Sequence, residues 1–223
     1  MRGKISEIFD SIQGEGLYLG ERQIFVRFFG CNLKCKYCDT PVGNYVEYEP
    51  QELLEELKKY GNGFHSVSFT GGEPLLQKDF LREVLQLTQK HGFRNYLETN
   101  GTLPVHLEHA IDYLDIIAMD LKLPSSTGLN DFWYTHHRFL EIASRKEVFL
   151  KAVICWNTKA EDIMAVVNFI RRANKSVVLV LQPNSYDSSE NLQHKLNDFR
   201  DICLNEKIPT CIIPQVHKKL DKR

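Results

Sequence analysis

The sequence has no long apolar run, no strong net charge and no internal repeat. Lys and Arg number 28 against 29 Asp and Glu, so the formal net charge is only -1 at pH 7. Such a balance does not favour a broad nucleic-acid or membrane partner. The first residues lack the apolar stretch of a signal peptide, and no later segment has the length and apolarity of a membrane span. We therefore expect a cytoplasmic globular protein that binds neither nucleic acid nor membrane.

Linkers and low-complexity tracts are also lacking. No Ser/Gly-rich stretch divides the 223 residues, and the 43% hydrophobic content is that of an ordinary globular protein. A chain of this length can bury a substantial core without disulfide or metal staples. We expect a single domain over residues 1–223.

Cysteine is sparse, but three of the six cysteines fall within eight positions. Cys31, Cys35 and Cys38 form the stretch "CNLKCKYC", directly after the apolar run "IFVRFF". In a reducing compartment such clustered thiols favour metal binding or chemistry over disulfides. The other cysteines stand in apolar contexts and are predicted to be small buried hydrophobic residues: Cys155, Cys203 and Cys211.

Strand and helix patterns alternate along most of the chain. Short, β-branched or aromatic runs predict strands at residues 4–9, 24–29, 65–70, 94–99, 115–120, 148–154, 177–182 and 210–214. Helical spacing of apolar residues predicts helices within 50–61, 75–92, 158–174 and 188–206. This alternation indicates βα units and a largely parallel sheet, in which reactive groups gather at the carboxyl ends of the strands.

The spacing of the clustered cysteines suits an iron-sulfur cluster. Three thiolates can hold a cubane cluster from one side and leave the fourth iron open to bind something else. A structural zinc site is the alternative, but it needs four ligands, and no second cysteine or histidine pair with zinc-site spacing follows. A non-catalytic iron-sulfur electron carrier or cluster scaffold is a further alternative.

The Cys-x3-Cys-x2-Cys loop, with Tyr37 before its last cysteine, resembles the signature of the radical S-adenosylmethionine (SAM) superfamily. The resemblance implies a [4Fe-4S] cluster on Cys31, Cys35 and Cys38, and SAM bound at the open iron. A second stretch, "FTGGEP", resembles the superfamily motif that binds the SAM amino group. The implied fold is α/β, a compact partial (β/α)6 barrel of the TIM-like, radical SAM type with few helices.

The stretch "DSIQGEGLYLGERQIFVRFFGCNLKCKYCDTP" resembles a narrower group, the 7-carboxy-7-deazaguanine synthase family. That resemblance implies a magnesium-dependent lyase of queuosine-type 7-deazapurine biosynthesis. Reductive SAM cleavage would yield a 5'-deoxyadenosyl radical that abstracts hydrogen from C6 of 6-carboxy-5,6,7,8-tetrahydropterin. The ring then contracts to 7-carboxy-7-deazaguanine with loss of ammonia. A homodimer and a flavodoxin- or ferredoxin-type electron donor are also implied.

The resemblance carries over residue by residue, without naming a catalytic acid or base. Arg27 matches a clamp for the substrate carboxylate, a role for which the bidentate guanidinium is suited, and Thr40 matches the residue that helps to hold Mg2+. The other substrate contacts implied are Ile12, Gln13, Gly14, Glu15 and Thr70. The SAM contacts implied are Tyr37, Cys38, Asp39, Gly72, Glu73, Asp120, Leu121, Lys122, Gln182, Pro183, Asn184 and Ser185.

Two further points remain open at the level of sequence. Polar residues from Glu98 to Thr102, and Ser125 and Ser126, also end predicted strands and are expected on the rim of the active site, although each could be a helix cap or turn residue. A radical SAM activating enzyme that makes a glycyl radical on a partner protein would share the cysteine spacing, but would not need the "QGEG" segment, Arg27 and Thr40 together.

Overall fold

The computed structural model describes residues 1–38, 43–174, 176–187 and 190–216. Nine strands form one sheet: β1 (Gly3–Ile12), β2 (Arg22–Phe28), β3 (Val46–Tyr48), β4 (Ser66–Gly71), β5 (Asn95–Thr99), β6 (Ile116–Asp120), β7 (Glu147–Ile154), β8 (Leu179–Pro183) and β9 (Thr210–Ile212). The described α-helices are α1 (Pro50–Lys58), α2 (Lys78–Lys90), α3 (Pro104–Ala110), α4 (Pro124–Thr127), α5 (Trp133–Ala143), α6 (Ala160–Ala173) and α7 (Glu190–Asn205).

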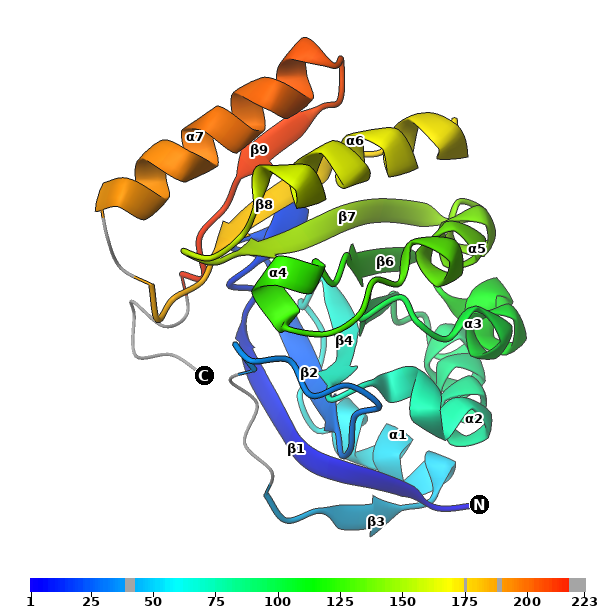
Figure 1. Cartoon of the computed structure of the whole chain (residues 1–223). Helices are drawn as coiled ribbons and strands as arrows, with labels where there is room; N and C mark the ends of the chain where they lie inside the picture. The colour runs from blue at the N-terminus through cyan, green and yellow to red at the C-terminus, as the bar shows by residue number, and fades with distance from the viewer. Residues whose placement is uncertain (39–42, 175, 188–189, 217–223) are drawn as a thin grey trace.

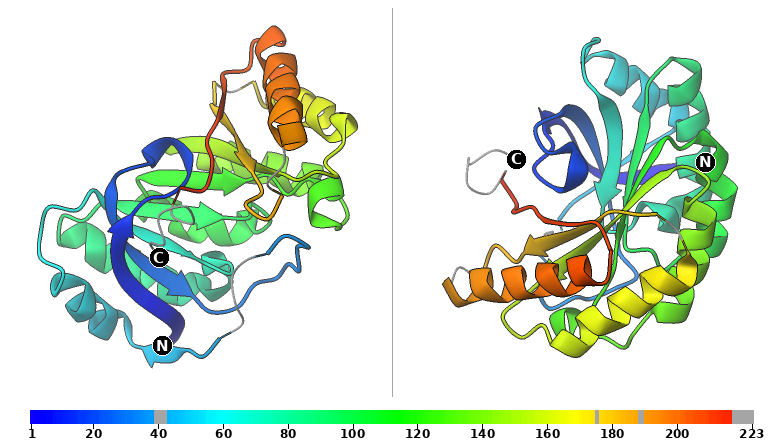
Figure 2. Two further views of the ribbon diagram at one scale, coloured as in Figure 1. Left: turned by 90° about the vertical axis from the view of Figure 1, so that its left-hand side faces the viewer. Right: turned by 90° about the horizontal axis from the view of Figure 1, so that it is seen from above.

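The sheet is parallel over most of its width and stays open. The strand order is β3-β1-β2-β4-β5-β6-β7-β8-β9, with parallel pairing from β2 through β9 and antiparallel pairing of β1 with β2 and with β3. The curved sheet carries its larger helices on the outside (Figures 1 and 2). Among the described residues no ladder joins β9 to β3. The predicted partial barrel is confirmed.

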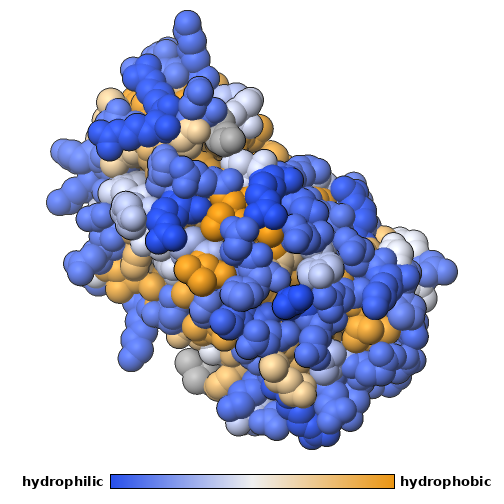
Figure 3. All heavy atoms as spheres, turned by 90° about the vertical axis from the view of Figure 1, so that its right-hand side faces the viewer, coloured by the Kyte–Doolittle hydropathy of each residue, from blue (hydrophilic) through white to orange (hydrophobic). Residues whose placement is uncertain are grey.

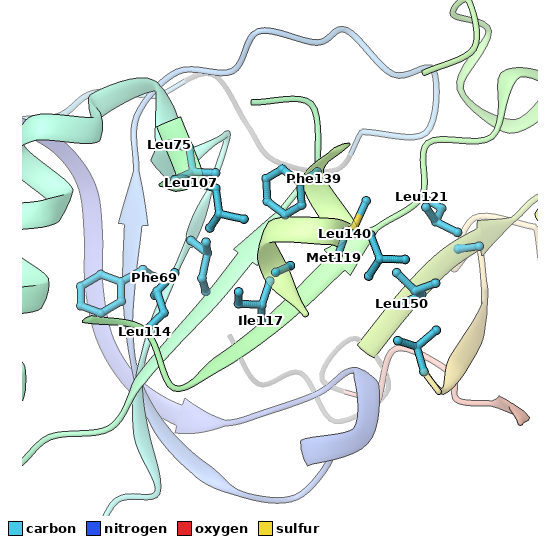
Figure 4. Close-up of a cluster of buried hydrophobic side chains, with 14 of the residues drawn as sticks. Phe69, Leu75, Leu107, Leu114, Ile117, Met119, Leu121, Phe139, Leu140 and Leu150 are labelled. Atoms are coloured by element: carbon cyan, nitrogen blue, oxygen red, sulfur yellow. The ribbon is translucent and has the colours of Figure 1, made fainter. Parts of the chain in front are cut away.

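The main core lies between the outside of the sheet and the helices. Alternate strand residues such as Val67, Phe69, Ile117 and Met119 point outward and are buried against helical residues that include Phe139. Figure 4 shows this layer, in which side chains from β4, β6 and β7 meet residues from α3 and α5. Side chains alternate between the two faces of each strand, and the apolar residues of each helix lie along one side. The outward strand residues therefore pack against the apolar sides of the helices to form this core.

The intervening strand residues face the inside of the barrel and are of mixed character. A small apolar cluster of Tyr96, Ile116, Ala118, Phe149 and Val180 occupies one part of the interior. Polar side chains follow at the next inward positions of these strands and also face inward from β2 and β4. These inward polar residues include Gln23, Arg27, Thr70, Glu98, Asp120, Lys151 and Gln182.

The loop between β1 and β2 folds back at the amino ends of the parallel strands. Because β1 is antiparallel to β2, Ile12 pairs with Arg22 at the start of β2, far along the strand from the cysteine loop. Gly16 follows with φ of +66°, and a Cβ there would lie 2.7 Å from the Phe149 ring. Only glycine fits this close approach without strain. The segment therefore enters the barrel from the end opposite the cysteines.

All eight predicted strands are present, and the four predicted helices correspond to α1, α2, α6 and α7. Strand β3 and helices α3, α4 and α5 were not predicted. Cys155 and Cys203 are buried as expected, whereas Cys211 is only partly buried.

The outer face in Figure 3 is mostly hydrophilic. In the part of the chain that the structure describes, no helix has the length and apolarity needed to cross a membrane.

Candidate active site

The cysteine loop opens onto a large cavity at the carboxyl ends of the strands. This cavity has a volume of about 1170 Å³, and Cys31, Cys35 and Cys38 all line it. The loop follows β2, whose parallel neighbour β4 ends in the "TGGEP" turn. The two motifs are thus brought side by side, as the sequence predicts.

The three thiols line one cavity, where each could bind a separate iron of a cluster. Within the described ranges, no three His, Cys, Asp or Glu side chains surround one point as the ligands of one metal ion do. A cubane cluster makes a different demand, since its cysteines bind separate irons at its corners. Burial raises the pKa of the Cys31 and Cys35 thiols. Iron would displace those protons, because the thiolate is the ligand.

Gly72 lets the turn after β4 press against the cysteine loop. A Cβ on Gly72 would lie 2.0 Å from the Gly30 carbonyl oxygen and 3.0 Å from the Cys31 nitrogen. The Glu73 N–H donates to the Gly30 carbonyl at 2.9 Å. The position therefore excludes any side chain, and the turn exposes backbone next to the first cysteine.

Glu73 is fully buried and does not line the cavity. Its carboxylate accepts hydrogen bonds from the backbone N–H groups of Leu75 and Asn100 and from the Thr99 hydroxyl. Burial raises the pKa of Glu73 to about 7 in spite of these donors. In this structure Glu73 ties the turn after β4 to the end of β5.

Charged and polar groups line the cavity beyond the cysteines. Lys122 forms an ion pair with Asp120 at 2.8 Å and lies 5.4 Å from the centre of the Tyr37 ring. Burial works against the Lys122 ammonium, but Asp120, Tyr37 and Cys35 together raise its pKa well above the ordinary value. Asp120 Oδ1 and Gln182 Oε1 are buried acceptors that have no hydrogen-bond partner among the described residues. Two such acceptors fit a ligand that brings its own donors, as the ribose and amino groups of SAM do.

The floor of the cavity is an ordered network around Gln13. The Gln13 amide nitrogen donates to Gln23 Oε1 and to Glu98 Oε1, both at 2.9 Å. Its oxygen accepts the Glu15 N–H at 3.1 Å, while Thr70 donates to Glu98 Oε2 at 2.8 Å. Both N–H groups of the Gln13 amide are already used. Its side chain is thus a brace for the floor, and Glu98 is held open to the cavity.

Glu15 lies beside Gln13 and is held from two other elements. Its carboxylate forms an ion pair with Lys151 of β7 and accepts from Gln215 at 2.5 Å. The Val216 N–H donates to the Gly14 carbonyl at 3.0 Å. The segment after β9 therefore meets the β1–β2 loop across the open side of the barrel.

Arg27 projects from β2 into the same cavity. It forms an ion pair with Glu7 at 3.5 Å, and its guanidinium lies 5.5 Å from the centre of the Phe9 ring. Both side chains of the ion pair are partly exposed. A cation at this place can receive a carboxylate from the cavity.

The structure brings most of the predicted site residues to one cavity. Those that line it are Ile12, Gln13, Gly14, Glu15, Arg27, Cys31, Cys35, Tyr37, Cys38, Thr70, Gly72, Asp120, Lys122, Gln182 and Asn184. Glu73, Leu121, Pro183 and Ser185 do not line it. Asp39 and Thr40 lie outside the described residues. Sequence reasoning missed Lys151 and Gln215, which line this cavity, and Gln23, which supports its floor without lining it.

Comparison with known proteins agrees with this geometry. Residues 25–194 match the Radical SAM superfamily. A 7-carboxy-7-deazaguanine synthase of Geobacter sulfurreducens is 36% identical, with 96% of each chain covered. One of Archaeoglobus fulgidus is also 36% identical, over the full length of both chains. The chain belongs to the 7-carboxy-7-deazaguanine synthase family. The fold is similar to the crystal structure of QueE from Escherichia coli, with a TM-score of 0.69, 21% identity and coverage of 95% and 93%.

Membership of the 7-carboxy-7-deazaguanine synthase family confirms the sequence-based prediction of a radical SAM enzyme. It favours the cluster over the zinc alternative for the three cysteines, since radical SAM proteins use a [4Fe-4S] cluster and SAM. The roles of individual site residues remain predictions.

Proposed function

We propose that this protein converts 6-carboxy-5,6,7,8-tetrahydropterin to 7-carboxy-7-deazaguanine with loss of ammonia. The observation that carries the proposal is the single cavity that the three cysteines, Arg27 and the floor residues Gln13 and Glu15 all line. This cavity would therefore hold the radical generator beside a polar surface that can recognise the substrate. A glycyl-radical activating enzyme needs room for a peptide of its partner protein and has no evident use for this ordered floor.

The residues divide into two groups by their chemistry. Cys31, Cys35 and Cys38 would hold the cluster, and Asp120, Lys122 and Gln182 offer the polar contacts for SAM. When bound, the cluster and SAM supply the radical that abstracts hydrogen from the substrate. The protein's own residues then have to place C6 of the tetrahydropterin within reach of that radical.

The substrate presents two features that the cavity matches. Its guanine-like edge carries N–H donors, which the Glu15 and Glu98 carboxylates can accept. Its carboxylate needs a cation, and Arg27 supplies one. The family resemblance adds Mg2+ at Thr40, where a hard ion with oxygen ligands would orient the substrate carboxylate. The resemblance also supports a homodimer, a flavodoxin- or ferredoxin-type electron donor and action in the cytoplasm as a single radical SAM domain.

The test is product formation by anaerobically reconstituted protein with SAM, a reductant, Mg2+ and the carboxytetrahydropterin. We expect 7-carboxy-7-deazaguanine, detected by mass. Arg27→Ala should lower kcat/KM by about 10- to 150-fold with the cluster retained, because a hydrogen bond to a charged group contributes about 1.5–3 kcal/mol. Cys35→Ala should lose both cluster and activity.

Arg22→Ala is the matched control. Arg22 lies at the other end of β2, pairs with Asp10 and does not line the cavity. Its loss should leave turnover near the wild-type value. No product from wild-type protein with an intact cluster, or equal loss of cluster in the Arg27 and Cys35 variants, would contradict the proposed roles.

A further inference from the structure

Lys151 is a buried cation inside the barrel, in the middle of the apolar run of β7 that extends from Val148 to Ile154. Its side chain is only 11% exposed, and that of Glu15, its ion-pair partner, is 16% exposed. The two residues are 136 positions apart in the chain. A buried lysine is rare unless it is paired, so its place calls for a specific reason.

Lys151 pairs with Glu15 and not with the carboxylate that is its neighbour in the sheet. Asp120 is its register partner on the neighbouring strand β6, and parallel neighbours point to the same side of a sheet. Asp120 nevertheless pairs with Lys122 at 2.8 Å, while Lys151 reaches across the cavity to Glu15. The cation is thus directed to the floor and away from the proposed SAM contacts.

Glu15 and Glu98 both line the cavity, but they are held in different ways. Glu98 accepts from two neutral donors, Gln13 and Thr70. Glu15 has a cation beside it. The Lys151 ammonium and the Gln215 amide each hold one oxygen of Glu15, so the carboxylate presents fixed acceptors where the substrate edge presents donors.

We propose that Lys151 is a positioning residue for substrate binding, whose ammonium holds the Glu15 carboxylate in place and directed at the N–H edge of the substrate. The inference rests on the proposed function. Lys151 itself need not touch the reacting atoms. The charges that face Lys151 are the carboxylates of Glu15, Asp120 and Glu98, and they raise its pKa although burial opposes the charged form. The ammonium therefore persists across the neutral pH range.

The experiment is a double-mutant cycle on the full, reconstituted protein. Lys151→Met, Glu15→Gln and the double variant are compared with wild type for kcat and for the KM of the carboxytetrahydropterin. SAM cleavage without substrate and iron content report on the radical machinery. We expect Lys151→Met to raise KM at least tenfold with substrate-free SAM cleavage unchanged, and Lys151→Arg to restore much of the loss.

The double variant separates positioning from a general structural role. If Lys151 acts through Glu15, adding Lys151→Met to Glu15→Gln should have little further effect on KM. The neutral pair also avoids an unpaired buried charge, so this comparison remains available if Lys151→Met alone does not fold. Lys146→Met, at the amino end of β7 and outside the cavity, is the control and should leave KM unchanged.

The outcomes distinguish the two proposals. A wild-type KM in Lys151→Met, or effects of the two substitutions that multiply in the double variant, would overturn the role of Lys151. Wild-type protein that carries its cluster but makes no product would instead count against the proposed function.

Discussion

Replacing Gly72 by alanine should displace the cysteine loop and prevent normal cluster assembly. The new Cβ would lie 2.0 Å from the Gly30 carbonyl oxygen, whereas an ordinary contact begins at 3.4 Å. The difference of 3.4 - 2.0 = 1.4 Å has to be taken up by backbone on both sides. The 2.9 Å hydrogen bond from Glu73 N to Gly30 O spans the same gap and would break.

The Gly72→Ala substitution lowers the free energy of unfolding in two ways, through a steric clash and through a lost hydrogen bond. Overpacking of a tight interior contact costs about 1–3 kcal/mol, and the lost hydrogen bond adds about 1 kcal/mol. The sum, about 2–4 kcal/mol, corresponds to a fall in Tm of about 5–15 °C for a chain of this size. Because Cys31 directly follows Gly30, we expect the iron bound per chain to fall below half of the wild-type value.

The measurement compares Tm and iron and sulfide content after identical reconstitution. Gly61→Ala is the control, since a Cβ there meets nothing within 4 Å and only the φ of +70° opposes it. That strain costs about 1 kcal/mol and lies away from the cysteines. Full iron content in Gly72→Ala, with a Tm no lower than that of Gly61→Ala, would refute the reasoning.

Two further predictions concern Glu73 and Gln23. Burial raises the pKa of Glu73 from 4.5 to about 7, so the folded state keeps a proton that the unfolded state releases. The free energy of unfolding of the cluster-free protein should therefore fall by about 2–3 kcal/mol between pH 5 and pH 8 relative to Glu73→Gln; parallel curves in urea denaturation would contradict this. Gln23→Leu removes the acceptor of the Gln13 amide and should raise the KM for the pterin about 5- to 30-fold, since an unsatisfied buried group costs about 1–2 kcal/mol. Ser66→Ala, which removes only the next member of that network, should have a smaller effect, and equal effects of the two would argue against a role through Gln13.

The strands could be predicted because their apolar runs are strong and regular. Strand β3 is only three residues long, and two of its three residues are exposed, so it carries little pattern. Helix α5 buries His136 alongside Phe139 and Leu140. A polar residue on the buried side obscures the helical stripe from which such an element is predicted.

Site residues that belong to short contiguous motifs could be predicted from the sequence. Site residues that only the fold brings together could not. The cysteine loop and "TGGEP" are short contiguous signals. Lys151 belongs to the floor only through Glu15, which is 136 positions away in the chain, and Gln23 only through its hydrogen bond with Gln13 on the other side of the β1–β2 loop. A weak signal was present, since "VFLKAVI" places one lysine in an otherwise apolar strand. Recognising its meaning required knowing which face of β7 points inward.

The contact between Gly14 and Val216 joins the two ends of the chain at the open side of the barrel. Gln13, Glu15 and Gln215, which form or brace the floor, lie outside residues 25–194, the part shared with the radical SAM superfamily. The cysteines, Asp120 and Lys122 lie inside it. Changes confined to the two terminal segments would therefore alter the floor of the cavity, whereas Arg27, Glu98 and Lys151, which also face the proposed substrate site, belong to the segment that carries the cysteines.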